Sequence, residues 1–328
     1  MKIDITEYEK RYSFELEPVT QLCGQNIVKK TYILESIRRY FSTYKYSEEK
    51  NKWRDNVKID SETVGRKFFT VLSVSNISDI LTAIKLSKQS LMVEYIKSMM
   101  QKFDWQLHLR TINEELETMF QMMNADLSRL GDLELTYAVS DLWNMIQKSD
   151  VTGVNQTLLE EKENYEILII FLNLLEEVMM INPKKMLILL ENIDHWVSGA
   201  EYRNIIEKIE NIVKKYDVYF ILTTSIDGYA VCNKELCAGI HIVGDVQFQM
   251  PEFEEILNYV NGIYPCNKKL SIQEIEKDLK KIIQKIGRMD YLYTIEENVI
   301  CKLINETLLL KEKWPDTENL LEIAFLKS

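Results

Sequence analysis

The chain has 328 residues, 46% of them hydrophobic, and a formal net charge of -11 at pH 7. This length and apolar content are enough to bury the core of more than one domain. Charged side chains interrupt each apolar run before about 18 residues, so no membrane-spanning helix is predicted, and the polar N-terminus is not typical of a signal peptide.

The five cysteines form no Cys-x-x-Cys pair, and the three histidines are scattered along the sequence. This pattern argues against a disulfide framework and against a zinc site. We therefore expect free thiols in a reducing cytoplasm. The residues themselves indicate no metal ligand.

The predicted elements begin with a strand, a loop and a helix. Residues 19–24 are a short apolar strand, and after a glycine-containing turn residues 31–41 have helical spacing. The charged stretch 43–67 is expected to be a loop or an exposed hairpin, and residues 67–75 are predicted to form a strand.

A helical pattern follows over residues 76–165, which we interpret as an inserted helical subdomain. The continuous apolar run 186–190 predicts a buried parallel strand, followed by an amphipathic helix over 200–216 and a third core strand at 218–223. Strand, helix and strand in this order predict an α/β fold with a parallel sheet.

Beyond Pro251 the chain is predicted to be helical again, at 252–263, 271–286, 294–311 and 316–327. The predicted organisation has three parts. They are an α/β head formed by 1–75 with 166–250, a helical leg formed by 76–165, and a C-terminal helical module formed by 251–328.

The sharpest motif spans Gly24 to Thr31. It matches Gly-x-x-x-x-Gly-Lys-Thr except at the second glycine, where Lys29 stands before Lys30 and Thr31. In a phosphate loop, backbone amides and the helix N-terminus surround the phosphates, while the lysine neutralises them. The alternative is an ordinary strand-to-helix turn with a capping hydroxyl.

A second block, residues 182–192, resembles the Asn-Pro-Lys, apolar strand and acid-acid block of ABC-type ATPases. By this resemblance Glu191 takes the magnesium-side position, while Asn192 replaces the general base. Ser225 stands where such enzymes carry a histidine, and no Leu-Ser-Gly-Gly-Gln signature precedes the helix near residue 165. An amide cannot accept the proton that a carboxylate base accepts. We therefore expect a degenerate P-loop fold without hydrolysis.

Together these residues, and above all the block from Leu22 to Asp55, resemble the large-chain group of the Csn family of type II-A CRISPR systems. The resemblance implies a degenerate P-loop head, a helical leg and a homotetrameric ring that threads linear double-stranded DNA by its ends. It further implies a non-enzymatic role in spacer acquisition beside the CRISPR integrase complex and the effector nuclease. Calcium is a possible ion by the same resemblance.

Two groups of basic residues are candidates for contacting DNA phosphates, although the chain as a whole is acidic. Positions 277, 281, 285 and 288 share a helix face by their spacing. For any single lysine the alternative is a solvated face balanced by nearby acids. The first group is Lys45, Lys50, Lys52, Arg54, Lys58, Arg66 and Lys67, and the second is Lys268, Lys269, Lys277, Lys281, Lys285 and Arg288.

Two other functions stay open from the sequence. One is an active ATPase of ABC or SMC-like type, in which Lys30, Thr31 and Glu191 bind ATP and magnesium. The other is an acidic scaffold that recruits proteins without contacting DNA. Measurable ATP affinity that depends on Lys30 would favour the first, and salt-sensitive retention of linear duplex would exclude the second.

Overall fold

The computed structural model describes residues 1–7, 10–42, 56–127, 135–136, 143, 146–244, 247–265, 269–287 and 294–308. The chain divides into two compact units. The first consists of Met1–Ser75 with Lys185–Ser328, and the second is Asn76–Lys184.

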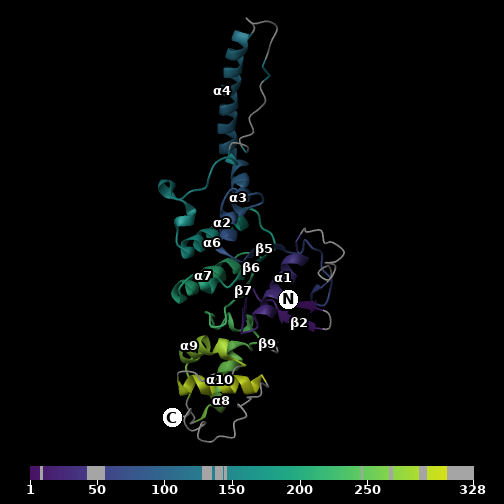
Figure 1. Ribbon diagram of the computed structural model, residues 1–328, viewed down its shortest axis with the longest axis vertical. Coiled ribbons are helices and arrows are strands. Elements are labelled where there is room, and N and C mark those ends of the chain that lie inside the picture. Colours follow the sequence, from purple (N-terminus) through teal and green to yellow (C-terminus); the bar gives the residue numbers. More distant parts are fainter. Residues whose placement is uncertain are drawn as a thin grey trace. The chain divides into compact units, whose positions relative to one another are not determined.

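The first unit is built on a six-stranded sheet of order β5-β6-β7-β3-β8-β9 (Figure 1). Neighbouring strands from β5 to β8 are parallel, and β9 is antiparallel to β8. The predicted α/β class with a parallel-rich sheet is confirmed, as are the strands near 19–24, 186–190 and 218–223. The strand bounds are β3 Val19–Cys23, β5 Thr70–Val74, β6 Met186–Glu191, β7 Val218–Thr223, β8 Ile240–Val243 and β9 Gln247–Gln249.

A three-stranded antiparallel sheet of order β2-β1-β4 was not predicted. Its strands are β1 Lys2–Glu7, β2 Lys10–Glu15 and β4 Val57–Ile59. The sequence does carry the signal, because Ile3 and Ile5 alternate with polar residues, as do Tyr12 and Phe14. All four side chains are buried, as period-2 alternation requires for a sheet with one buried face.

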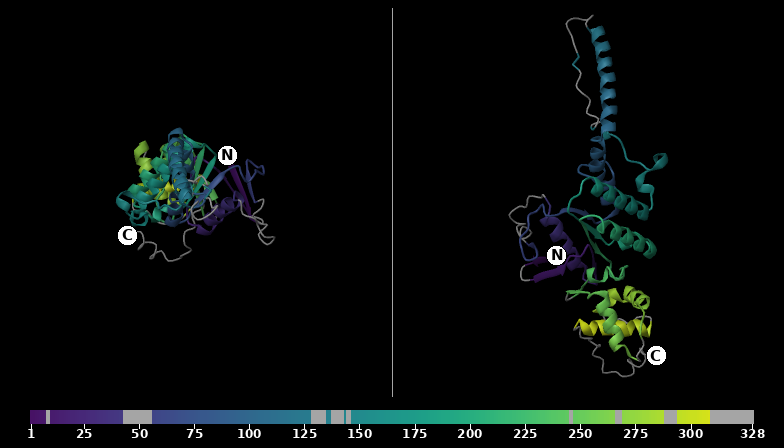
Figure 2. Two further views of the ribbon diagram at one scale, coloured as in Figure 1. Left: turned by 90° about the horizontal axis from the view of Figure 1, so that it is seen from above. Right: turned by 180° about the vertical axis from the view of Figure 1, so that it is seen from behind.

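Helices α1 (Ile27–Tyr40) and α7 (Gly199–Val213) lie on opposite sides of the six-stranded sheet, as Figures 1 and 2 show. Ile33 of α1 belongs to one core with Ile3 of the small sheet and Leu187 of β6. The small sheet therefore covers α1, and the central strands are buried on both faces. Double burial explains why these strands are continuous apolar runs rather than alternating ones.

The helices beyond residue 251 belong to the first unit and not to a separate module. Ile275 and Leu279 share a hydrophobic core with Cys23 of β3 and Ile242 of β8, so their apolar faces are buried against the sheet strands. The predicted helix 252–263 agrees with the structure, whereas the predicted helix 271–286 is α-helical only as far as Ile282. The predicted helix 294–311 is observed over Ile295–Thr307, and residues 309–311 and 316–327 lie outside the described residues. The observed bounds are α8 Phe253–Ile263, α9 Ile272–Ile282, a 3₁₀ turn at Ile283–Lys285 and α10 Ile295–Thr307.

The second unit contains α2 Ile77–Ile84, α3 Leu91–Met100, α4 Phe103–Leu127 and α6 Asn164–Ile181. Helix α6 contacts α2 and α3, so it groups with the inserted helices and not with the head as predicted. The prediction of a helix through residue 165 is wrong for residues 151–163, which form only the short 3₁₀ helices Val154–Gln156 and Leu159–Glu161. Among the described residues no helix is long and apolar enough to cross a bilayer.

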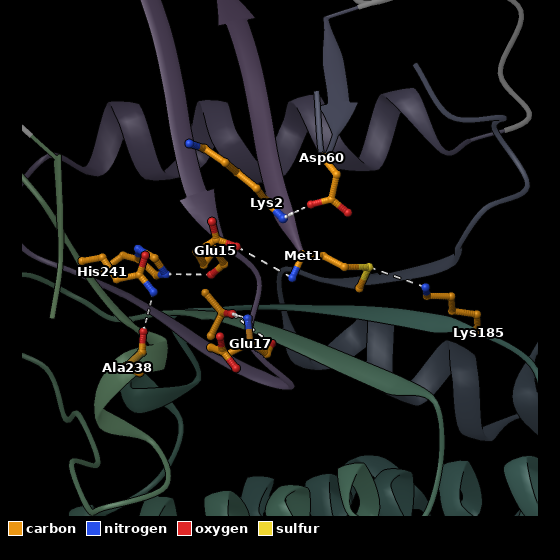
Figure 3. Close-up of polar contacts among 10 residues, drawn as sticks. Met1, Lys2, Glu15, Glu17, Asp60, Lys185, Ala238 and His241 are labelled. Atoms are coloured by element: carbon orange, nitrogen blue, oxygen red, sulfur yellow. Dashed lines mark hydrogen bonds and ion pairs between the residues drawn. The ribbon is translucent and has the colours of Figure 1, made fainter. Parts of the chain in front are cut away.

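Strand β8 is connected to the N-terminal hairpin at His241 (Figure 3). The His241 Nε2 atom lies 3.0 Å from the backbone oxygen of Glu15, and the ring packs edge-on against Phe14. His241 is 1% exposed, and its Nδ1 atom has no hydrogen-bond partner among the described residues. This burial lowers the pKa of His241 from 6.5 to about 4.

We expect acid to destabilise the fold through His241. Between pH 6.5 and 4 the unfolded chain binds a proton that the folded chain does not, so the free energy of unfolding decreases as the pH falls through this window. From pH 7.5 to 5 the parent protein should lose about 2 kcal/mol more than the variant His241→Gln. Urea unfolding at both pH values measures this difference, and an identical pH dependence of the two proteins would contradict it.

Candidate functional site

The connection between β3 and α1 has the geometry of a tight turn into a helix. Gly24 has a φ of +88°, and the backbone of Val243 on the neighbouring β8 comes so close that a Cβ atom would lie 2.8 Å from its oxygen. The helix begins at Ile27, earlier than the predicted residue 31, because the Asn26 side chain caps it by accepting from the Lys29 amide at 3.0 Å. The cap is thus an amide oxygen, and the hydroxyl of Thr31 is not the capping group.

The two lysines of the motif point to carbonyl oxygens of the protein itself. Lys30 is 2% exposed, and its Nζ donates to the oxygens of Gly24 at 2.8 Å and Thr224 at 2.5 Å. Burial lowers the pKa of the Lys30 ammonium, against the opposing effect of nearby Cys23. Lys29 Nζ donates to the oxygen of Gly244 at 2.7 Å. Both ammonium groups are therefore already engaged within the chain.

The acidic block lies at the end of β6, beside the end of β7. Glu191 is half-buried, and Asn192 adopts a left-handed backbone with φ of 48°. The Asn192 amide donates to Thr223 Oγ1 at 3.1 Å, and the same hydroxyl donates to Asn192 Oδ1 at 3.3 Å. Asn192 therefore links the ends of β6 and β7 by hydrogen bonds. The sequence predicted only that Asn192 replaces a catalytic base, and the structure adds this structural role.

Asp194 is a buried carboxylate that was not among the predicted site residues. Its oxygens accept hydrogen bonds from the backbone amide and the hydroxyl of Ser225, at 3.0 Å for the amide. Gly228 lies against it, because a Cβ atom there would be 1.6 Å from Asp194 Oδ2. The sequence offered one indication of this residue, because Asp194 is a second acidic residue close to Glu191, two positions after Asn192. Ser225, which stands where ABC-type ATPases carry a histidine, is thus hydrogen-bonded to the internal carboxylate of Asp194.

Gln284 was also missed, and it comes from the C-terminal helical segment. Its Oε1 atom accepts from the Gly24 amide at 3.0 Å, and its Nε2 atom donates to Thr224 Oγ1 at 2.7 Å. The side chain is 5% exposed. No sequence signal marks this contact, because 260 residues separate the two partners.

The basic candidates are only partly described by the structure. Lys45, Lys50, Lys52, Arg54, Lys268 and Arg288 lie outside the described residues. Of the others, Lys58, Lys67, Lys269 and Lys277 are exposed and Arg66 is half-buried.

Two lysines of the second group form ion pairs within the protein. Lys281 pairs with the buried carboxylate of Glu297, and Lys285 lies 3.1 Å from Asp227. The single α-helical face predicted over 277, 281, 285 and 288 does not extend to Lys285, because α9 ends at Ile282 and the 3₁₀ turn Ile283–Lys285 follows. Arg288 lies outside the described residues. Such a face would require the helix to continue to residue 288.

The described residues contain no cluster of three or more His, Cys, Asp or Glu side chains that could hold a metal ion. Calcium binding therefore stays a prediction from the resemblance, with no ligand set assigned. In the β3–α1 loop the ammonium groups of Lys29 and Lys30 both donate to carbonyl oxygens of the protein itself.

Comparison with known families classifies the chain. The sequence profile described as "CRISPR-associated protein Csn2 subfamily St" matches residues 5–310. The chain belongs to the Csn2 family. The predicted resemblance to the Csn proteins of type II-A CRISPR systems is thereby confirmed, and the family is implicated in CRISPR adaptation.

Solved structures were compared with the fold of this Csn2 protein. The crystal structure of Stu0660 of Streptococcus thermophilus shares the fold, with a TM-score of 0.86 at 24% identity, over 100% of this chain and 99% of that chain. A crystal structure of an SmcHead bound to the C-winged helix domain of ScpA has a TM-score of 0.42 at 13% identity, over 76% of this chain and 97% of that chain. A search of curated protein sequences gives no match.

Substituting Gly24 tests the close approach of the loop to β8 in this Csn2 protein. Gly24→Ala should lower the free energy of unfolding by about 2 kcal/mol or more, because an L-residue is strained at this φ and its Cβ meets the Val243 backbone. Gly65→Ala is the matched control, since no heavy atom lies within 4 Å of its added Cβ. Its effect should stay within about 0.5 kcal/mol. An equal decrease for both variants in urea unfolding would contradict the geometry.

Proposed function

We propose that this Csn2 protein binds linear double-stranded DNA through the phosphates, without sequence preference and without nucleotide hydrolysis, in support of spacer acquisition. The observation that carries the proposal is the family match over residues 5–310. Adaptation captures DNA fragments of arbitrary sequence, and a protein that serves it needs contacts to the phosphates and not to particular bases.

The β3–α1 loop supports the non-enzymatic part of the proposal. We take this loop as a degenerate P-loop, in which Lys30 donates to two carbonyls and Lys29 to a third. Asn192 cannot act as a general base, and Ser225 is held by Asp194. An active ATPase would need Lys30, Thr31 and Glu191 to face a nucleotide, and Lys30 instead faces the protein interior.

Exposed basic residues support the DNA-binding part. Lys58 and Lys67 in one segment and Lys269 and Lys277 in another are exposed, so phosphates can reach them. Lys281 and Lys285 are weaker candidates because each already has an acidic partner. The assembly proposed is a homotetrameric ring around the duplex, working with the CRISPR integrase complex and the effector nuclease.

A gel-shift titration of linear duplex DNA, on protein whose mass is measured by light scattering, tests the proposal. We expect saturable binding by a tetramer to duplexes of unrelated sequence, weakened by salt, with or without ATP. Absence of salt-sensitive retention would favour a scaffold that does not contact DNA. Hydrolysis of ATP with multiple turnover would favour the ATPase.

A further inference from the structure

The loop between β7 and β8 holds two thiols close together. Cys232 and Cys237 belong to one hydrophobic core, and both are 0% exposed. Between them the chain makes a single turn, in which the Cys237 amide donates to the Asn233 oxygen at 3.1 Å. The Asn233 side chain closes the same turn, because its Oδ1 accepts from the Leu236 amide at 2.8 Å. A turn of this kind folds the chain back, so the residues on either side of it approach each other.

The two thiols contact each other directly. A hydrogen bond with Cys237 raises the pKa of Cys232 well above its usual value, and burial acts in the same direction. A disulfide forms only where the two side chains point toward each other over a short distance. The contact between the thiols meets this condition, and no movement of the backbone is needed to bring the sulfur atoms together.

The sheet fixes both ends of the segment that carries the pair. Gln21 of β3 holds the residue before Cys232, since its Nε2 donates to the Val231 oxygen at 2.7 Å and its Oε1 accepts from the Val231 amide at 3.0 Å. At the other end, Cys237 begins a 3₁₀ turn, Cys237–Gly239, that leads directly into β8. The two thiols are therefore kept together as long as this loop stays on the sheet.

Cys301 is a buried cysteine of the same core with a different contact. Its Sγ atom accepts from Asn305 Nδ2 at 3.7 Å. Burial is thus common to all three cysteines, and the contact between thiols is what distinguishes Cys232 and Cys237. This difference makes Cys301 the control for oxidation of a buried thiol.

We propose that Cys232 and Cys237 are a disulfide-forming pair, oxidised by hydroperoxides, whose cross-link closes the β7–β8 loop. One thiol reduces the peroxide, becomes a sulfenic acid and releases one molecule of water or alcohol. The second thiol then displaces the hydroxyl of the sulfenic acid as water, and the S–S bond forms. The two sulfur atoms together lose two electrons, which the peroxide O–O bond accepts. This inference does not depend on DNA binding.

Burial controls how fast the pair reacts. The thiolate is the reactive form of cysteine, and a thiol with 0% exposure meets a peroxide only when the loop opens locally. Once formed, the disulfide links the two sides of the turn and restrains further opening. Oxidising conditions should therefore convert a loop that opens at intervals into one that stays closed, and a thiol reductant should reverse the change.

Treatment of the folded parent with hydrogen peroxide, followed by blocking of free thiols and peptide mass spectrometry, tests the proposal. Trypsin cleaves after Lys234 and endoproteinase Glu-C after Glu252, which separates Cys237 from both Cys232 and Cys266. We expect the peptides of Cys232 and Cys237 to be joined by a disulfide that dithiothreitol cleaves. In the oxidised protein the Cys237 amide should exchange with deuterium about ten times more slowly than in the reduced protein.

Two variants serve as controls. Cys301→Ser removes a buried cysteine of the same core and should form the cross-link as the parent does. Cys232→Ser should form no cross-link at Cys237, and peroxide should leave the exchange of the Cys237 amide unchanged. If Cys232→Ser does not fold, the comparison of oxidised with reduced parent still decides the question.

Three outcomes would contradict the inference. Free thiols at both positions after peroxide treatment, or sulfinic acid at one of them without a linked peptide, would overturn the disulfide. A disulfide from Cys237 to Cys266 in place of Cys232 would overturn the pairing. A cross-linked protein whose Cys237 amide exchanges as fast as in the reduced protein would overturn the closing of the loop.

Discussion

Replacing Lys30 by alanine is expected to lower the free energy of unfolding by about 3 kcal/mol. The ammonium bonds to the oxygens of Gly24 and Thr224, and its removal leaves two buried carbonyls without this donor. Removal of a buried charge offsets part of that decrease, because burial already disfavours the charged form of Lys30. Urea unfolding followed by circular dichroism measures the change in the transition midpoint at constant slope.

Lys29→Ala is the neighbouring control for this prediction. Lys29 is only half-buried, and its ammonium makes a hydrogen bond to Gly244. We expect this variant to be less stable than the parent by about 1 kcal/mol. If Lys30 instead served a nucleotide, the two variants would unfold alike, and added ATP would stabilise the parent but not Lys30→Ala. That result would contradict the structural role assigned to Lys30.

DNA topology is expected to control binding. A closed ring without an opening step can load only at a DNA end, so linear duplex should be retained and relaxed covalently closed circles of the same sequence should not. A surface groove would accept both. Gel shift with the two forms at equal length and salt makes the comparison, and nicked circles serve as the control because they are relaxed but have no free double-strand end. Equal retention of nicked circles and linear fragments would exclude threading.

Charge reversal at exposed lysines is the companion test of the DNA surface. The pairs Lys58 with Lys67, and Lys269 with Lys277, are suitable because all four side chains are exposed. Reversing a pair should weaken binding of every duplex alike. It should also reduce the slope of log affinity against log salt by about 0.9 for each phosphate that is no longer neutralised.

Lys281 is unsuitable for such a test. Its partner Glu297 is buried, so Lys281→Glu would place two carboxylates together and destabilise the helices themselves. An unaltered salt slope in both exposed pairs would show that DNA approaches another face.

Local and periodic features of the fold follow from the sequence alone. The strands at 19–24, 186–190 and 218–223 are predicted from short, mainly apolar runs beside turn residues, and the structure has them at Val19–Cys23, Met186–Glu191 and Val218–Thr223. An apolar run of this length is what a strand buried on both faces requires. The strands of the small N-terminal sheet could have been predicted from alternation such as that of Ile3 and Ile5. The pairing of β1 with β4 could not, because the paired residues are more than fifty positions apart in the sequence.

The roles of the motif residues, in contrast, depend on how the chain packs in three dimensions. Lys30 turns to Gly24 and Thr224 because β3 and β7 are neighbours in the sheet, and sheet order is not encoded in local spacing. Gln284 reaches Gly24 across 260 residues, and Lys281 finds Glu297 only because α9 and α10 pack together. Hydrophobic periodicity specifies which face of an element is buried. The hydrogen-bond partners of a buried polar group, in contrast, are determined by which distant segments the tertiary fold brings next to it.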